Sequence, residues 1–293
     1  MICDAVGGVL QTLPEGKRVW GAVGGVLHTL PEAKRVWGVT SLDNLLYVLR
    51  DKSSIQIEVY DVRSYRFQRC FTVQGLRAMA DMIACSRNSC LYISGYTDKC
   101  VHRVAVPNVD VTKWPVSDKL TRLSVTDTHS VLVMCCEVRQ IKEFTTHGKL
   151  LRQIQLPQDV VSPKKAFQSS SGEFIVCHGD VTDPVHRVCL VGSDGQVVQS
   201  YGGPRGSGSE QMDVPAHMVV DRNGFVFVAD CNNYRVLLLS PELTYVREVA
   251  SREQLKWKPL RLYLDDDRRR LYVAENVRDG HKHTAGRVVV ISV

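Results

Sequence analysis

The sequence predicts an all-β protein with the architecture of a six-bladed β-propeller, and three observations support this prediction. Short β-prone cores recur at steps of 45, 40, 43, 52 and 45 residues, counted between their central residues, and this is the period of a four-stranded propeller blade. Polar turns flank the cores. No amphipathic helical pattern of a dozen residues lies between them, which disfavours alternating helices and strands. The cores are residues 46–48, 91–93, 131–133, 174–176, 226–228 and 271–273.

In each repeat a turn precedes the core and a further alternating strand follows it. In the fifth repeat a polar turn at 221–224 leads into the core, a strand at 235–238 follows, and 240–242 form the next turn. Short polar connections between alternating runs are typical of antiparallel hairpins. Outer strands such as 149–156 and 196–201 complete the units. Comparable turns lie at 41–44, 86–89, 169–172 and 265–268. Comparable strands follow the cores at 55–60, 103–106, 187–190 and 287–290.

The last repeat lacks one strand. Strands are predicted at 260–264, 271–274 and 287–291, and the chain then ends at Val293. An unpaired edge would expose backbone donors and acceptors and leave the ring open. Residues 23–30, directly before the first strand of blade one at about 35–39, have a suitable pattern. We therefore expect an N-terminal strand to close the ring inside the last blade.

The N-terminus contains a direct duplication. Residues 5–21 and 22–38 match at 15 of 17 positions and differ only at Gln11/His28 and Gly16/Ala33. Only the second copy has a predicted structural role. We expect residues 1–21 to form a peripheral extension and residues 22–293 to form the propeller.

Composition excludes several classes of protein. The chain has 23% charged and 44% hydrophobic residues and a formal charge of +6, which is typical of a globular protein and excludes a disordered tail or a polybasic arm. No apolar run approaches the roughly 18 residues that a membrane span requires. No secretory leader is visible at Met1. These features predict a cytoplasmic protein without membrane contact.

The ten cysteines do not form a zinc-binding pattern. No Cys-x-x-Cys pair occurs, whereas structural zinc modules take paired thiolates from one tight turn. We expect reduced cysteines that act as small apolar core residues. His281 and His283 are the tightest histidine pair, but no third ligand accompanies them. The sequence therefore predicts no metal site and no small-molecule cofactor.

Catalytic motifs are also missing from the sequence. It contains no Gly-x-Ser-x-Gly elbow, no phosphate-binding loop that ends in Lys-Ser/Thr, and no His-Glu-x-x-His. The glycine-rich segment 202–208 does not lead into a helix, so it cannot form an anion cradle of that type. We expect it to be a flexible loop between blades, and we expect no catalytic residues in the chain.

The segment from Asp230 to Val236 carries a family resemblance. Its sequence, Asp-Cys-Asn-Asn-Tyr-Arg-Val, resembles the NHL repeat, with Tyr234 at the position usually held by histidine. Partial copies occur at 101–104 and 185–188. The chain is similar to the C-terminal NHL propellers of tripartite-motif proteins. In that family a RING, a B-box and a coiled coil carry ubiquitin-ligase activity, and these modules are absent here, so such activity would need a longer form or a partner.

The resemblance implies a non-catalytic platform that binds a protein partner. We expect the partner to contact Asn232, Asn233, Tyr234, Trp257 and the nearby basic residues Lys256, Lys258 and Arg278. Asp230 and Arg235, the hallmark pair, are expected to order the connection by bidentate hydrogen bonds across the hairpin rather than to contact a ligand.

RNA binding is the alternative interpretation, since some propellers of this family resemble RNA readers. Trp257 between Lys256 and Lys258 could stack a base. However, the predicted loop face carries a net charge of only +2, and phosphate binding requires a concentrated excess of positive charge. A metal-dependent lyase is a third, minor alternative, because NHL propellers include one, but the required ligand cluster cannot be assembled from the sequence.

Overall fold

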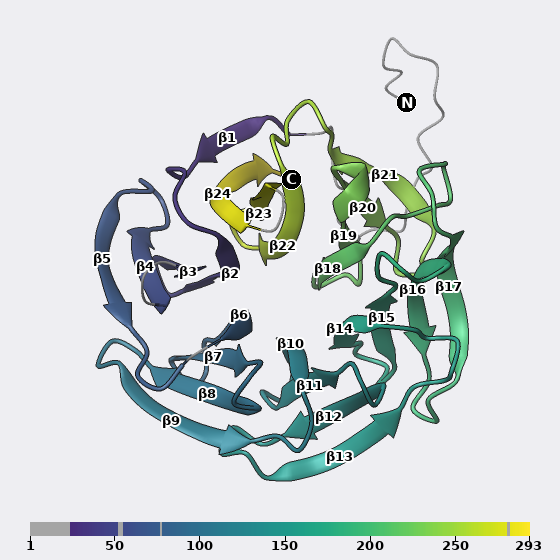
Figure 1. The fold of residues 1–293 in the computed structure, drawn as a ribbon, viewed down its shortest axis with the longest axis horizontal. Helices are drawn as coiled ribbons and strands as arrows, with labels where there is room; N and C mark the ends of the chain where they lie inside the picture. The colour runs from purple at the N-terminus through teal and green to yellow at the C-terminus, as the bar shows by residue number, and fades with distance from the viewer. Residues whose placement is uncertain (1–23, 52–54, 77, 280–281) are drawn as a thin grey trace, which may run out of the picture.

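The fold consists of six antiparallel sheets arranged in a ring around a central axis (Figure 1). The structure is a computed structural model, and it describes residues 24–51, 55–76, 78–279 and 282–293. Each sheet has four strands. The prediction of a six-bladed all-β propeller is therefore confirmed.

Blades 1 to 5 each use four consecutive strands, in order from the axis to the rim. Blade 1 contains β2 (Val36–Leu42), β3 (Leu45–Asp51), β4 (Ile55–Asp61) and β5 (Phe67–Thr72); blade 2 contains β6 (Met79–Cys85), β7 (Cys90–Gly95), β8 (Cys100–Ala105) and β9 (Asp110–Pro115); blade 3 contains β10 (Leu120–Val125), β11 (Val131–Cys135), β12 (Gln140–Phe144) and β13 (Leu150–Gln155); blade 4 contains β14 (Pro163–Gln168), β15 (Phe174–His178), β16 (Val185–Val191) and β17 (Val197–Pro204); blade 5 contains β18 (Pro215–Val220), β19 (Val226–Asp230), β20 (Arg235–Leu239) and β21 (Tyr245–Ala250).

Blade 6 joins the two ends of the chain. Its inner three strands are β22 (Lys258–Asp265), β23 (Arg270–Asp279) and β24 (Lys282–Ser292), and the N-terminal strand β1 (Val26–Thr29) pairs with β24 as the outermost strand. The Leu30 N–H continues this pairing by donating to the Val288 carbonyl at 2.9 Å. The predicted closure by an N-terminal strand is confirmed. The upstream copy of the duplication lies outside the described residues.

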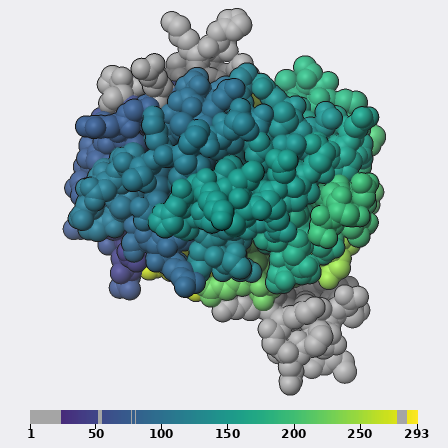
Figure 2. Space-filling view, turned by 90° about the horizontal axis from the view of Figure 1, so that it is seen from below, coloured from purple at the N-terminus to yellow at the C-terminus, as the bar shows by residue number. Residues whose placement is uncertain are grey.

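The hydrophobic core consists of clusters shared by neighbouring blades. Second strands such as β11 and β19 are buried along their whole length, since they lie between an inner and a third strand and are covered on both faces by adjacent blades. The cluster between blades 6 and 1 includes Leu30, Val36, Tyr272 and Val290. Equivalent clusters lie between every other pair of neighbours. Figure 2 shows the ring from its edge, where the teal segments of the middle blades form a continuous surface.

One predicted loop is partly a strand. β17 extends through Gly202 and Gly203 to Pro204, and these residues pair with β16 as far as Val185. Gly202 has a φ of +99°, and a Cβ there would lie 2.4 Å from the His186 carbonyl oxygen. Glycine is needed at this position because the backbone of β17 passes so close to β16. The expectation of a loop over the whole of 202–208 was therefore wrong for its first three residues.

The two faces of the ring carry different connections. The face that we call the linker face carries the links between blades together with the connections between second and third strands. Backbone hydrogen bonds join these segments, for example from Tyr96 N–H to the Ala78 carbonyl at 3.0 Å and from Asn232 N–H to the Asp213 carbonyl at 2.9 Å. The opposite face, the hairpin face, carries the turns that precede each second strand.

Candidate functional site at the propeller axis

Six equivalent positions of the inner strands surround the axis. Each inner strand has a shift in its pairing register near its start, and the residue at or directly after the shift occupies the same place in every blade. Such irregularities often redirect a side chain. These axial positions are occupied by Gly38, Asp81, Arg122, Lys165, His217 and Arg261. One acid thus lies among three cations and a histidine.

Asp81 is the centre of this axial cluster. Its Oδ2 accepts a hydrogen bond from the Leu123 N–H at 3.1 Å and lies 3.4 Å from Lys165 Nζ. Its Oδ1 lies 3.5 Å from His217 Nε2 and 3.8 Å from Arg261 Nε. Burial alone would raise the pKa of Asp81, but Lys165, His217 and Arg261 outweigh it and hold the pKa well below its usual value. The carboxylate therefore stays ionised at neutral pH.

Lys165 and His217 are in direct contact inside the cluster. Lys165 Nζ lies 2.8 Å from His217 Nε2, and the Leu262 N–H donates to His217 Nδ1 at 3.2 Å. Both side chains are almost completely buried. Burial and the neighbouring Lys165 keep the pKa of His217 well below its usual value. Burial also lowers the pKa of Lys165, against the opposing effect of Asp81.

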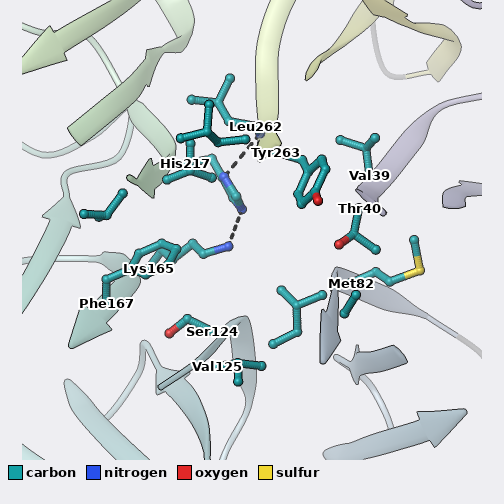
Figure 3. A pocket seen from close by; sticks show the side chains of 15 residues that line it. Val39, Thr40, Met82, Ser124, Val125, Lys165, Phe167, His217, Leu262 and Tyr263 are labelled. Atoms are coloured by element: carbon teal, nitrogen blue, oxygen red, sulfur yellow. Dashed lines mark hydrogen bonds between the residues drawn. The ribbon is translucent and has the colours of Figure 1, made fainter. Parts of the chain in front are cut away.

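A cavity opens from the axial cluster on each side. On the linker face, the mouth cavity has a volume of about 400 Å³. It is lined by Trp37, Asp51, Ala78, Met79, Tyr96, Thr121, Arg122, Cys136 and Lys164. Toward the hairpin face, the inner cavity has a volume of about 190 Å³ and is lined mainly by apolar side chains, with Lys165 and His217 at its polar end (Figure 3). Lys165 and His217 of the axial cluster line the inner cavity, and Arg122 lines the mouth cavity.

The aromatic residues Trp37 and Tyr96 and the cations Arg122 and Lys164 line the mouth cavity, and further arginines contact Trp37 from outside the lining. The Arg35 guanidinium lies 3.9 Å from the centre of the Trp37 ring, and Arg261 Nε donates to the Trp37 carbonyl at 2.9 Å. Tyr96 is 39% exposed. Lys164 forms an ion pair with Asp180. The cavity therefore presents aromatic surface next to positive charge.

The predicted partner-binding residues of blade 5 lie on the same linker face. Asn232 accepts a hydrogen bond from Lys258 Nζ at 2.7 Å and donates to Asp213 at 2.9 Å. Tyr234 is half-buried, with Lys258 Nζ 5.7 Å and the Arg252 guanidinium 4.6 Å from the centre of its ring. The structure therefore brings Asn232, Tyr234 and Lys258 together.

Trp257 and Lys256 lie next to this group. Lys256 Nζ is 4.6 Å from the centre of the Trp257 ring and forms an exposed ion pair with Glu32 at 2.7 Å. The Trp257 N–H donates to Glu275 at 3.3 Å, which ties the linker to blade 6. Arg278 is part of β23, but its side chain lies outside what the structure describes.

The hallmark residues Asp230 and Arg235 have structural contacts. Arg235 Nε donates to Asp230 Oδ2 at 2.8 Å, and Arg235 Nη2 donates to the Gln211 carbonyl at 2.8 Å. Asp230 is fully buried and also accepts from the Asp213 N–H and from Asn233. The pairing across the hairpin is present, but the prediction of bidentate bonds was wrong: Arg235 bonds to the carboxylate through Nε, because its Nη2 binds the linker. This arrangement fastens the β19–β20 connection to the preceding linker.

Within the described ranges, no three His, Cys, Asp or Glu side chains converge as metal ligands. His281 lies outside these ranges, as does the side chain of His283. The nine described cysteines are free thiols. In the same part of the chain, no helix has the length and apolar character required to cross a membrane.

Sequence reasoning missed the axial cluster, although a signal for it was present. The six axial positions are separated by 43, 41, 43, 52 and 44 residues, which follows the spacing of the β-prone cores. Charged residues at this spacing inside inner strands would have indicated a polar ring. The mouth cavity had no comparable signal, because its wall combines residues from inner strands and from linkers.

Comparisons with known proteins support the propeller fold. No family model matches the chain, and no curated protein matches it. Among solved structures, virginiamycin B lyase from Staphylococcus aureus is similar, with a TM-score of 0.61, 8% identity, and coverage of 91% of this chain and 100% of that one. A Kuenenia stuttgartiensis hydrazine synthase structure gives a TM-score of 0.59 at 13% identity over 92% of this chain and 96% of that one. A streptogramin B lyase gives 0.58 at 11% identity over 88% and 94%.

At these identities the similarity concerns the fold. The chain is a six-bladed β-propeller, and its structural neighbours include lyases and other propellers.

Proposed function

We propose that this propeller is a binding module that recognises an acidic peptide segment of a partner protein on its linker face. The observation that carries the proposal is the mouth cavity, in which the aromatic residues Trp37 and Tyr96 lie near Arg122 and Lys164. Tryptophan, tyrosine and arginine are the residue types most often found as energetic anchors of protein interfaces. An apolar side chain of the partner would occupy the cavity.

The charge of the cavity favours an acidic ligand. Among the described residues of the lining, Arg122 and Lys164 contribute positive charge and Asp51 contributes negative charge, and Asp180 pairs with Lys164 from beside the cavity. The axial Arg261 lies just behind Trp37. A carboxylate that enters with an apolar anchor would meet cations in a partly desolvated site, where attraction is stronger than in bulk water. The preferred segment therefore combines an aromatic or aliphatic residue with a neighbouring Asp or Glu.

The partner's footprint would extend beyond the cavity. A stable interface usually covers about 800 Å² per partner, which exceeds the mouth of one cavity. On the same face, Tyr234, Lys258 and Trp257 form an aromatic and basic cluster. We therefore include Asn232, Asn233, Tyr234, Lys256, Trp257, Lys258 and Arg278 in the proposed partner surface.

Selection of peptides tests this proposal. A random peptide library displayed on phage is selected on the purified chain, and enriched peptides are measured by titration. We expect an acidic residue beside an apolar one, and a loss of about tenfold or more in affinity for Tyr96→Ala and for Lys164→Gln. Tyr245→Ala is the matched control, because Tyr245 is 50% exposed on outer strand β21, away from the cavity. Equal binding by all three variants would refute the proposal.

The same chain distinguishes a protein partner from RNA. Capture from cell extract with and without ribonuclease is compared for the wild type and for the double variant Tyr234→Ala/Arg278→Ala. A protein partner is retained after ribonuclease treatment and is lost by the double variant while the melting temperature changes little. For RNA, the logarithm of affinity would fall steeply with the logarithm of salt concentration. A steep slope with an RNA oligomer would favour the alternative function.

A further inference from the structure

Lys165 lies at the polar end of the inner cavity, on the side of the axial cluster opposite the mouth cavity. The walls of the inner cavity are mostly apolar and include Val39, Met82, Val125 and Phe167 (Figure 3). Phe167, Val220 and Leu264 are only partly buried, so the cavity reaches the hairpin face past apolar side chains. A lysine at the end of an apolar passage is an unusual environment for a charged ammonium group.

The hydrogen bonds around His217 favour a neutral lysine. Because the Leu262 N–H donates to Nδ1, Nδ1 accepts, and the proton of the neutral imidazole must be on Nε2. This Nε2 has two neighbours, of which Lys165 Nζ is the nearer at 2.8 Å and Asp81 Oδ1 lies at 3.5 Å. An ammonium group has three donors and no acceptor, so it cannot accept this proton. A neutral amine can, since its nitrogen carries a lone pair.

The surrounding charges favour the neutral amine. Among the described residues, Asp81 is the carboxylate beside Lys165, at 3.4 Å, and it is shared with His217 and Arg261. Arg122 and Arg261 both oppose a further positive charge at this place, and burial opposes it more strongly still. These effects agree with the direction that the hydrogen bonds require.

We propose that Lys165 is a nucleophilic amine that binds an apolar aldehyde covalently, as an imine, in the inner cavity. The amine nitrogen attacks the carbonyl carbon and forms a carbinolamine. The carbinolamine hydroxyl then leaves as water together with the remaining hydrogen of the nitrogen, and a C=N bond replaces the C=O bond. The step requires no oxidant or reductant, and water can reverse it. This covalent site is separate from the linker face and is independent of the proposed function.

Reductive trapping tests the proposal, with benzaldehyde as the probe. The folded chain is incubated at pH 7 with benzaldehyde and sodium cyanoborohydride, which reduces the imine to a stable secondary amine, and the labelled lysines are identified by peptide mapping. Lys164 is the internal control, because it is adjacent in sequence but lies in the mouth cavity beside Asp180. We expect labelling of Lys165 at least about tenfold faster than of Lys164, since each pKa unit lost makes about tenfold more neutral amine.

Variants complete the test. Lys165→Met should remove the fast-labelled site, whereas Lys164→Met should retain it. If Lys165→Met fails to fold, the map of the wild-type chain decides alone. Labelling of exposed Lys113 and of Lys164 without labelling of Lys165 would overturn the proposal. This result would mean either that the Lys165 amine is charged or that the probe cannot enter the cavity, and the proposal requires that neither is true. Peptide binding at the linker face would be unaffected by either outcome.

Discussion

Lys165 of blade 4 contacts His217 of blade 5 through their side-chain nitrogens at 2.8 Å, although 52 residues separate them in the sequence. Both groups also lie within 3.5 Å of Asp81 in blade 2. The axial cluster therefore connects three blades through side chains. Its stability depends on one carboxylate, Asp81, which accepts the Leu123 N–H and compensates the positive charges of Arg122 and Arg261. This dependence has measurable consequences whatever the protonation state of Lys165.

Asp81→Asn is expected to destabilise the fold by about 3–5 kcal/mol, because removing one partner leaves buried positive charge without its counter-charge. Urea unfolding followed by circular dichroism measures this change. Glu137→Gln is the control, since Glu137 forms an exposed pair with Lys119 and such pairs contribute at most about 1 kcal/mol. Equal stability of the two variants would contradict the role of Asp81.

Acid should weaken the same cluster. The folded-state pKa of Asp81 is far below its usual value, so its contribution is fully present above the unfolded-state pKa of about 4 and is lost as the pH falls toward the folded-state pKa. The wild type should therefore lose more stability than Asp81→Asn between pH 5 and pH 2, as measured by urea unfolding at each pH. Parallel curves for the two proteins would contradict this prediction.

His178 provides a second pH dependence, at higher pH. Burial and the adjacent Arg187 lower the pKa of His178 from 6.5 to about 4, and Arg187 Nε donates to its Nε2 at 3.3 Å. As the pH falls, His178 is protonated in the unfolded chain at about pH 6.5 but in the folded chain only at about pH 4. The stability contributed by neutral His178 is therefore present above pH 6.5 and is lost as the pH falls from about 6.5 to about 4. His178→Gln should reduce the slope of stability against pH in that window. An unchanged slope would show that His178 does not contribute to it.

Closure of the ring by β1 is tested by two leucines of the same segment. Leu30→Ala should cost about 2–5 kcal/mol, because Leu30 is fully buried between blades 6 and 1. Leu27→Ala should cost much less, because Leu27 is 51% exposed. Thermal unfolding measures both. Similar melting temperatures for the two variants would contradict the closure.

Truncation tests the two copies of the duplication. Deletion of 1–17 should leave the melting temperature nearly unchanged, whereas deletion of 1–33 removes β1 and should lower it sharply. Residues 1–17 lie outside the described structure, so this prediction rests on the sequence. If both truncations behaved alike, ring closure by the second copy would be contradicted.

The sequence was sufficient to predict the blades because each second strand is a short apolar run between polar turns, and this local pattern repeats. The closure was predictable for a similar reason, since the last repeat lacked a strand and residues 23–30 had a matching pattern. Asp81, Lys165 and His217 can be recognised only by the spacing of polar residues from repeat to repeat, because each is a single polar residue in a different repeat. Their meeting follows from the ring geometry and from the register shifts of β6, β14 and β18.

The glycines at the end of β17 were misread for a related reason. A run of glycines usually indicates a loop, but at Gly202 it reflects the close approach of two strands. The mouth cavity was also beyond prediction, because Trp37, Tyr96 and Lys164 come from three blades and their relative positions depend on the packing of the whole ring.

A crystal structure of the chain with one enriched acidic peptide tests the proposed function most directly. We predict that an apolar side chain of the peptide lies between Trp37 and Tyr96 and that its neighbouring carboxylate is within hydrogen-bonding distance of Arg122 or Lys164. A peptide bound on an outer strand or on the hairpin face, with the mouth cavity unoccupied, would contradict the proposal.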